Sequence, residues 1–125
     1  MILGIGIDSV DIAEMQRLCA DKQDAFVRKT FSASEQIEAE SRPDRAQVFA
    51  GKFAVKEAVF KALGHLTSEG GFNFRIIETL EDSNGYPSVT MTDEVKELLH
   101  QAGAKEILVS ITNENNVATA IALVQ

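Results

Sequence analysis

One stretch of sequence, residues 49–64, constrains the fold more than any other. It is rich in Ala, Val and Phe and ends in glycine, a composition that predicts a helix with a glycine stop. At about 100° per residue its apolar side chains nearly surround the axis, which is typical of a buried helix. It also carries four charged residues, Lys52, Lys56, Glu57 and Lys61. Charges on a buried helix need partners or a ligand.

Two explanations of these charges are open from the sequence. Glu57 precedes Lys61 by four residues, which is the favourable order for an ion pair within a helix. Three lysines and one carboxylate nevertheless leave the segment net positive, which favours an anionic ligand. Basic residues also gather just before the helix, at Arg42 and Arg45, whereas much of the acid lies in other stretches. A phosphate-rich ligand bound together with a cation would satisfy charges of both signs.

The composition excludes several classes of protein. With 125 residues and 45% hydrophobic content, the chain is expected to form one domain with a proper core. A formal charge of −7 argues against non-specific binding to nucleic acid or to an anionic membrane. No long apolar run and no basic start are present, so we expect a cytosolic protein. The single cysteine, Cys19, excludes an internal disulfide and predicts a buried structural residue, so any metal would be held mainly by oxygen.

The first segments are defined by alternation and by helical spacing. Residues 2–8 alternate between apolar side chains and glycine, which predicts a strand packed on one side, with Asp8 on the face without large side chains. Residues 10–19 have the spacing of an amphipathic helix, and Ser9 is expected to cap it. The apolar residues at 26–31 are interpreted as a connection.

The middle of the chain predicts a short helix and the start of the long one. Ser32 and Glu35 match a capping box, which predicts a helix toward Glu40. Pro43 is well tolerated at the first position of a helix, so the long helix is expected to begin there. Residues 65–71, with Thr, Ser and two glycines, are typical of a loop.

The last third of the chain predicts two hairpins and one helix. In order, the expected elements are a strand at 72–80, a tight turn at 84–85, a strand at 87–91, a helix at 93–101, a strand at 106–112, a turn at 113–116 and a strand at 117–124. The whole order is strand, three helices, two strands, helix and two strands. This order predicts an α+β fold.

Several of these segments together resemble one family, the holo-[acyl-carrier-protein] synthases, which are small bacterial 4′-phosphopantetheinyl transferases. Residues 50–64 are similar to the signature helix of the family, and they are the specific part of the match. Weaker similarities are found at 4–12, 31–35, 84–87 and 109–112. The resemblance covers essentially the whole chain in order, and it implies a single 4′-phosphopantetheinyl transferase domain over residues 1–125.

The resemblance implies an activity and a set of site residues. The family transfers the phosphopantetheine arm of coenzyme A to a serine of an acyl carrier protein, with magnesium and with release of adenosine 3′,5′-bisphosphate, for fatty-acid or other acyl synthesis. By resemblance, Asp8 and Glu57 hold the metal, and the metal binds the pyrophosphate. Lys61 neutralises the pyrophosphate, while Arg45 and Lys52 face the phosphates at the nucleotide end.

The chain departs from the family pattern at the end of one strand. By resemblance Thr112 and Asn113 lie on the side that binds coenzyme A, but many members carry His where this chain has Asn113 followed by Glu114. An amide cannot accept the proton of the serine. Glu114, a metal-bound water or a carboxylate of the carrier protein is left for that role.

The resemblance also implies partners. Members of the family are typically trimers with the site between subunits, and the acidic carrier protein docks on basic residues of the first helix. In this chain that helix has Glu14 where many members have Arg. The basic residues Arg17, Lys22, Arg28 and Lys29 form a thinner footprint, displaced toward the end of the segment. Steering of the carrier protein by charge is therefore expected to be weaker.

Two other functions are open from the sequence. Asn113 and Glu14 would suit a catalytically weak homologue that binds coenzyme A or a carrier protein as a regulatory or structural partner. A domain with a buried Glu57–Lys61 pair and no ligand is a further alternative, and it predicts no protection by nucleotide against thermal unfolding.

Overall fold

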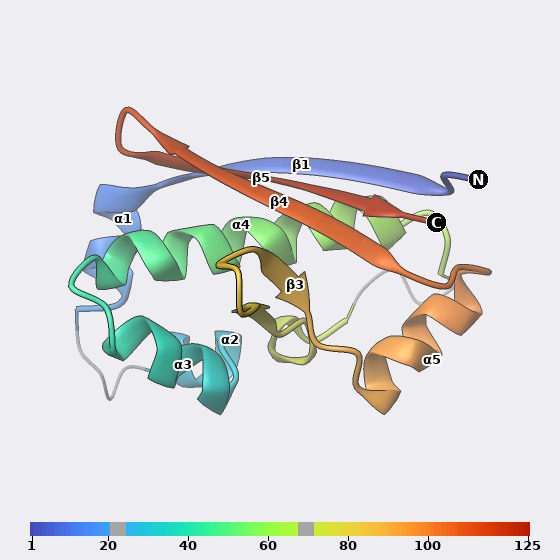
Figure 1. Ribbon diagram of the computed structural model, residues 1–125, viewed down its shortest axis with the longest axis horizontal. Coiled ribbons are helices and arrows are strands. Elements are labelled where there is room, and N and C mark those ends of the chain that lie inside the picture. Colours follow the sequence, from blue (N-terminus) through green and yellow to red (C-terminus); the bar gives the residue numbers. More distant parts are fainter. Residues whose placement is uncertain (21–24, 68–71) are drawn as a thin grey trace.

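A long helix, α4 (Arg45–Leu63), lies across one face of a three-stranded antiparallel sheet (Figure 1). The strands lie in the order β1 (Gly4–Asp11), β5 (Val117–Val124) and β4 (Ile107–Glu114), so β1 and β4 form the two edges. The first and last strands of the chain therefore pair with each other. Both chain ends lie at the same end of the molecule.

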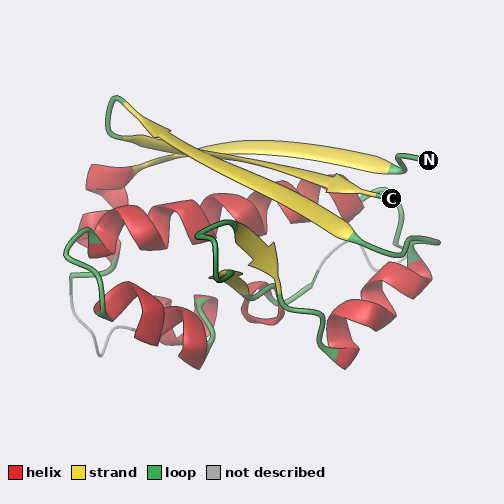
Figure 2. Cartoon of the chain, viewed as in Figure 1, coloured by secondary structure: helices red, strands yellow, loops and turns green. Residues whose placement is uncertain are grey.

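The remaining elements lie mainly beyond α4, on the side away from the sheet (Figure 1, Figure 2). The computed structural model describes residues 1–20, 25–67 and 72–125. The remaining elements are α1 (Ile12–Leu18), α2 (Ala25–Thr30), α3 (Ala33–Glu40), the 3-10 helix η1 (Phe74–Ile76), β2 (Thr79–Glu81), β3 (Pro87–Val89) and α5 (Asp93–Gln101). Within these ranges, no helix combines the length and the apolar character needed to cross a membrane.

The expected α+β fold is confirmed, with local differences. Residues 26–31 are not a simple connection, because most of them form α2, which buries Val27 and Thr30. A helix this short depends on packing rather than on intrinsic propensity, so its sequence signal is weak. The prediction of a strand over 72–80 is largely wrong, because residues 74–76 form η1 and the strand is limited to Thr79–Glu81. Its partner β3 has only three residues to pair with it. The long helix begins at Arg45 rather than at Pro43.

Side chains cap the starts of several helices. The capping box of Ser32 and Glu35 is present in both directions, and Thr92 Oγ1 accepts a hydrogen bond from the start of α5. The predicted cap at Ser9 is wrong. β1 continues to Asp11, and Asp11 caps α1 by accepting from the Glu14 amide at 3.1 Å. Ser9 instead points to the outer face of the sheet, where its hydroxyl lies 2.8 Å from that of Thr119.

β1 packs on α4 through its glycines. A Cβ atom on Gly4 would lie 2.1 Å from the carbonyl oxygen of Ala62, and one on Gly6 would lie 1.9 Å from that of Ala58. Only glycine permits such a close approach of strand and helix. The apolar side of β1 therefore faces outward, and Ile5 and Ile7 are 62% and 59% exposed.

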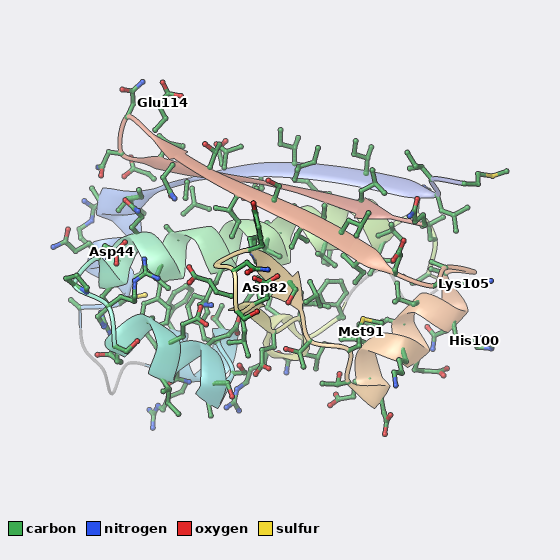
Figure 3. The ribbon with its side chains drawn as sticks, viewed as in Figure 1. Asp44, Asp82, Met91, His100, Lys105 and Glu114 are labelled. Atoms are coloured by element: carbon green, nitrogen blue, oxygen red, sulfur yellow. The ribbon has the colours of Figure 1, made fainter. Side chains whose placement is uncertain are left out.

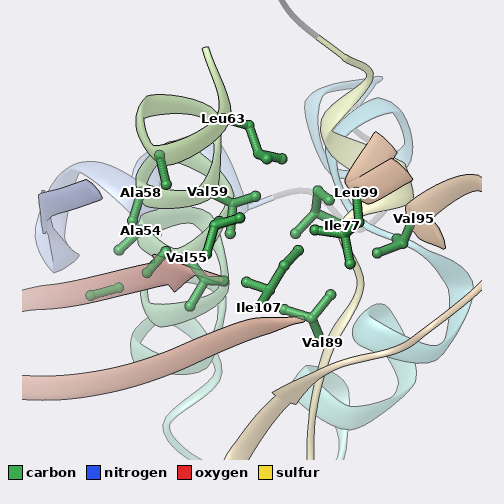
Figure 4. Packing of buried hydrophobic residues seen from close by; sticks show 14 residues of the cluster. Ala54, Val55, Ala58, Val59, Leu63, Ile77, Val89, Val95, Leu99 and Ile107 are labelled. Atoms are coloured by element: carbon green, nitrogen blue, oxygen red, sulfur yellow. The ribbon is translucent and has the colours of Figure 1, made fainter. Parts of the chain in front are cut away.

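Two hydrophobic clusters flank α4 on its buried sides. The larger one joins α4 to the sheet, α5 and η1 through residues such as Val55, Val59 and Leu99 (Figure 4). The smaller one joins the start of α4 to the first three helices, and it includes Phe49 and the fully buried Cys19. The prediction of Cys19 as a buried structural residue is thus confirmed. α4 is covered nearly all round, as its composition predicted.

Candidate active site

Asp8 and Lys61 meet where β1 crosses the second half of α4. The ammonium of Lys61 donates to Asp8 Oδ1 at 3.0 Å and to the carbonyl oxygen of Ile7 at 2.9 Å. The glycine contact at Gly6 brings the strand this close to the helix. The Asp8 side chain is 21% exposed and that of Lys61 is 52% exposed, so the pair lies at the edge of solvent.

Glu57 lies one turn before Lys61 on the same helix. Its carboxylate has neither a hydrogen bond nor an ion pair with any of the described residues. Partial burial raises the pKa of the Glu57 carboxyl, the negative charge of Asp8 raises it further, and the positive charge of Lys61 opposes both effects. The alternative of a Glu57–Lys61 ion pair is therefore wrong, because Lys61 binds Asp8 instead.

This pair of carboxylates has the chemistry of a hard-cation site. Asp8 and Glu57 come from different elements, and their charges disfavour each other, so a cation between them would relieve the repulsion. In the described ranges, His, Cys, Asp and Glu form no group of three or more that could hold a metal. Magnesium is commonly bound by one or two carboxylates, with water and substrate phosphate completing its shell. The donor set fits that pattern.

The other basic residues of this region are each matched by a carboxylate. The ion pairs described in this region are Arg42–Asp44, Arg42–Glu81, Arg45–Glu40, Lys52–Glu38, Lys56–Glu35 and Lys61–Asp8. The segment itself is net positive, as the sequence indicates, but its positive charge is not left in excess in the folded chain. Acidic residues that belong to other elements neutralise it. An incoming anion would have to compete with these carboxylates.

Lys52 lies on a different side of α4 from Glu57. The two residues are five positions apart, which places them about 140° apart around a helix. Lys52 is almost fully buried, and its ammonium donates to Glu38 Oε1 at 2.6 Å and to the carbonyl of Thr79. A groove on this side of α4 runs between α3, the β2–β3 hairpin and β4. Its walls include Lys52, Asn113, Arg42 and Glu81.

Arg45 does not line that groove. It belongs to an adjacent hollow beside α1, whose walls include Gln16 and Ala20. Its guanidinium binds Glu40 and the carbonyl oxygen of Cys19, and it lies 5.0 Å from the centre of the Phe49 ring. Within one chain, Lys52 and Arg45 therefore line two different, neighbouring depressions.

The end of β4 carries the last three predicted site residues. Thr112 and Glu114 are exposed, and Glu114 lies at the tip of the β4–β5 hairpin (Figure 3). The turn is narrower than predicted, because only Asn115 and Asn116 form it, with φ values of 52° and 61°. Positive φ at both central residues is the geometry of a two-residue hairpin turn. In one chain, β5 separates this strand from the strand that carries Asp8.

The predicted site residues thus form two groups in a single chain. Asp8, Glu57 and Lys61 lie together beside β1, whereas Lys52 and Asn113 meet in the groove beside β4. Sequence reasoning missed the acidic partners on α3. A signal for them existed, since Glu35 and Glu38, three residues apart, share one face of a helix, as do Lys52 and Lys56, four residues apart, on α4.

Comparison with known proteins identifies the family. The model of the 4′-phosphopantetheinyl transferase superfamily matches residues 4–122. The holo-[acyl-carrier-protein] synthase of Geotalea daltonii is 33% identical over 125 residues, which cover 100% of this chain and 99% of that protein. The sequence resemblance found for residues 50–64 and the weaker segments is thereby confirmed.

Solved structures agree with this assignment. The crystal structure of holo-[acyl-carrier-protein] synthase from Neisseria meningitidis superposes with a TM-score of 0.86 at 26% identity, covering 100% of this chain and 99% of that one. The Helicobacter pylori enzyme in complex with coenzyme A gives 0.78 at 27% identity, covering 97% and 99%. The chain belongs to the 4′-phosphopantetheinyl transferase superfamily, as an enzyme of the holo-[acyl-carrier-protein] synthase type.

Proposed function

We propose that this enzyme transfers the 4′-phosphopantetheine arm of coenzyme A to a serine of an acyl carrier protein, in a magnesium-dependent reaction that releases adenosine 3′,5′-bisphosphate. The observation that carries this proposal is the convergence of Asp8, Glu57 and Lys61 where β1 crosses α4. The coenzyme A complex of the Helicobacter pylori relative supports the choice of substrate. The reaction would serve fatty-acid or other acyl synthesis in the cytoplasm.

The residues beside β1 would handle the pyrophosphate. Asp8 and Glu57 would hold the cation, and Lys61 would neutralise a phosphate oxygen. When bound, magnesium would stabilise negative charge on the pyrophosphate as its bond breaks. The serine oxygen attacks the β-phosphorus, the bond to the bridging oxygen breaks, and adenosine 3′,5′-bisphosphate leaves with that oxygen.

The serine must also lose its proton. Asn113 is an amide and cannot accept it, so another acceptor is needed within reach of the hydroxyl. Glu114 follows directly in this chain and is exposed at the hairpin tip, where a second protein can reach it. We assign Glu114 as the acceptor of the serine proton. A carboxylate of the carrier protein is an alternative acceptor.

The nucleotide end of coenzyme A would lie in the groove beside β4. Lys52 and Asn113 contribute a cation and an amide there, and Arg45 adds a guanidinium from the neighbouring hollow. Thr112 precedes Asn113 on the strand but is not among the residues that line the groove. Because this group lies on the other side of α4 from Glu57, one chain would not offer both groups to one ligand. A site shared between copies would bring the two groups together.

The outer face of the sheet supports such an assembly. Ile5 and Ile7 on β1, Ile121 on β5 and Leu108 on β4 are all exposed on this face. Contiguous exposed apolar surface marks interaction sites, and closed symmetric assemblies are the usual outcome for identical chains. We propose that this face joins three copies into a homotrimer with shared sites.

The acyl carrier protein would dock on the first helices. Arg28 and Lys29 lie exposed in the last turn of α2, whereas Arg17 on α1 forms an ion pair with Glu14. Lys22, expected to add to this footprint, lies outside the described residues. Among the residues described on this side, the basic side chains without an acidic partner therefore lie mainly on α2, next to the partly buried Phe26.

Mass spectrometry tests the proposal directly. The protein is incubated with an apo carrier protein, coenzyme A and magnesium, and the carrier protein is expected to gain the mass of the phosphopantetheine arm. The same mixture without magnesium should show no gain. A carrier protein that binds but keeps its mass would favour the weak homologue instead, and a panel of carrier proteins would identify the cognate one.

A further inference from the structure

The ammonium of Lys61 lies beside Asp8, one of the two carboxylates proposed to hold the metal ion. It contacts Asp8 Oδ1 at 3.0 Å and the carbonyl oxygen of Ile7 at 2.9 Å. Both acceptors belong to β1, although Lys61 extends from α4. Glu57, the second carboxylate of the site, has no hydrogen bond or ion pair with any described residue. One of the two carboxylates is thus already occupied by a cation that belongs to the protein itself.

We propose that Lys61 is an internal placeholder for the divalent cation. In the cation-free protein its ammonium occupies Asp8, and it is displaced when Asp8 and Glu57 bind the metal together. The inference rests on the proposed function, because it takes the metal pair from there. It adds a competition between a side chain and the metal for the same carboxylate oxygen.

The burial of the three lysines on α4 singles out Lys61 for this exchange. Lys56 and Lys52 are buried, and each is bound by an acidic side chain together with backbone carbonyl oxygens. Departure of Lys56 would leave the fully buried Glu35 carboxylate without its countercharge, and the side chain of Lys52 is itself only 4% exposed. Lys61 is half exposed, and a lysine ammonium sits on a flexible four-carbon stem. It can leave Asp8 and remain close to the site.

Displacement has a consequence for the order of binding. While Lys61 is held by Asp8 and Ile7, part of its charge is already neutralised, so it attracts an anionic ligand less strongly. Once displaced by the metal, the same ammonium is released beside the bound cation. Metal and pyrophosphate are then coupled through one side chain, because each is bound better when Lys61 has left Asp8.

Binding of manganese to the protein without coenzyme A tests the competition. The free Mn²⁺ signal in electron paramagnetic resonance gives the affinity of wild type, Lys61→Met and Lys61→Gln. Both variants are expected to bind Mn²⁺ about three- to tenfold more tightly, the range set by loss of a partly exposed ion pair and of one nearby repulsive charge. Lys96→Met is the matched control, because it removes the same charge from an exposed position of α5.

Each outcome has a defined meaning. An affinity that stays equal or falls in both Lys61 variants overturns the placeholder role, and so does an equal gain in Lys96→Met, which would reflect net charge alone. Absence of binding to wild type and to both Lys61 variants overturns the inference together with the metal pair. Arm transfer by wild type, measured separately by mass spectrometry, shows whether the proposed function survives. Thermal unfolding without metal confirms that the variants are folded.

Discussion

Lys56 and Glu35 form an ion pair in which both side chains are completely buried, with Lys56 Nζ 2.8 Å from Glu35 Oε1. The same ammonium donates to the carbonyl oxygens of Phe74 at 2.8 Å and Ile77 at 2.7 Å, and Glu35 Oε2 accepts from the Thr79 amide. Burial lowers the pKa of Lys56, and the charge of Glu35 opposes that effect. The pair ties α3, α4 and the segment before β2 into one unit.

Removing one member of this pair should be costly. Lys56→Met leaves the Glu35 carboxylate buried without a countercharge, and we expect a loss of about 3–5 kcal/mol in the free energy of unfolding. The double variant Lys56→Met/Glu35→Gln should recover part of that loss, because it removes the unpaired charge while keeping an acceptor for Ser32. Denaturant unfolding measures both. A double variant no more stable than Lys56→Met would contradict this explanation.

Glu57→Gln should separate stability from activity. The pKa of Glu57 is raised, so the folded state binds a proton more readily than the unfolded state does, and the ionised carboxylate lowers stability at neutral pH. We therefore expect Glu57→Gln to raise the unfolding temperature of the metal-free protein at pH 7. The difference should shrink as the pH falls through the raised pKa toward the ordinary value of about 4.3.

The same substitution should abolish arm transfer, because it removes one charged oxygen ligand. Glu97→Gln, at an exposed position of α5, is the matched control and should change neither property. Full activity of Glu57→Gln at limiting magnesium would show that the metal assignment is wrong.

Glu114 and Asn113 can be tested as a pair. Glu114→Gln keeps the size of the side chain and removes the base, so transfer should slow. Asn113→His restores a titratable group beside it and should be tolerated or should improve transfer. The measurement is the pH profile of kcat. An unchanged profile for Glu114→Gln would exclude Glu114 as the proton acceptor and leave the other two acceptors that the sequence allows, a metal-bound water or a carboxylate of the carrier protein.

Charges on α1 and α2 should affect the binding of the carrier protein and leave the binding of coenzyme A nearly unchanged. Arg28→Glu or Lys29→Glu should raise KM for the carrier protein while KM for coenzyme A stays nearly constant, because charges at the rim of an interface mainly change the association rate. Glu14→Arg should lower KM for the carrier protein, and the gain should fade as salt screens charges over about 10 Å or less. If Glu14→Arg binds the carrier protein no better at low salt, α1 does not face it.

If the outer face of the sheet joins the copies, a charge placed on that face should lower the mass of the assembly. Ile7→Glu places a charge in the exposed apolar face, so light scattering should show a fall from about three times 13.6 kDa toward the mass of one chain, with loss of transfer. Ile37→Glu is the matched control, because Ile37 is 71% exposed on α3, away from the sheet. A wild-type protein that is already monomeric and active would exclude a shared site.

Local features of the fold were predictable from the sequence, and long-range pairings were not. The capping box at Ser32 and the body of the long helix follow from neighbouring residues, so periodicity and capping rules find them. The partners of Lys56 and Lys52 lie 21 and 14 residues away, on a helix whose orientation only tertiary packing fixes. The sequence therefore predicted that these charges need partners without predicting which ones.

The same distinction holds for the candidate site. Asp8 stood out because glycines surround it on one face of the strand, and that face proved to be the one that meets α4. The separation of Lys52 from Glu57 follows from their five-residue spacing on one helix, but the separation of Asn113 from Glu57 could not be predicted, because it depends on the strand order β1-β5-β4. Two residues close in sequence can therefore belong to opposite sides of one helix.

The close contact of β1 with α4 also determines which parts of the enzyme can diversify. At Gly6 there is no room for even a methyl group against the Ala58 carbonyl, so the separation of Asp8 from Glu57 is fixed by two backbones. Exchange of core side chains can alter stability while that separation stays constant. In contrast, side chains determine the shape of the groove beside β4 and of the surface at the exposed turns. Adaptation to a new carrier protein or acyl group would therefore accumulate there, and residues 4–8 would change last.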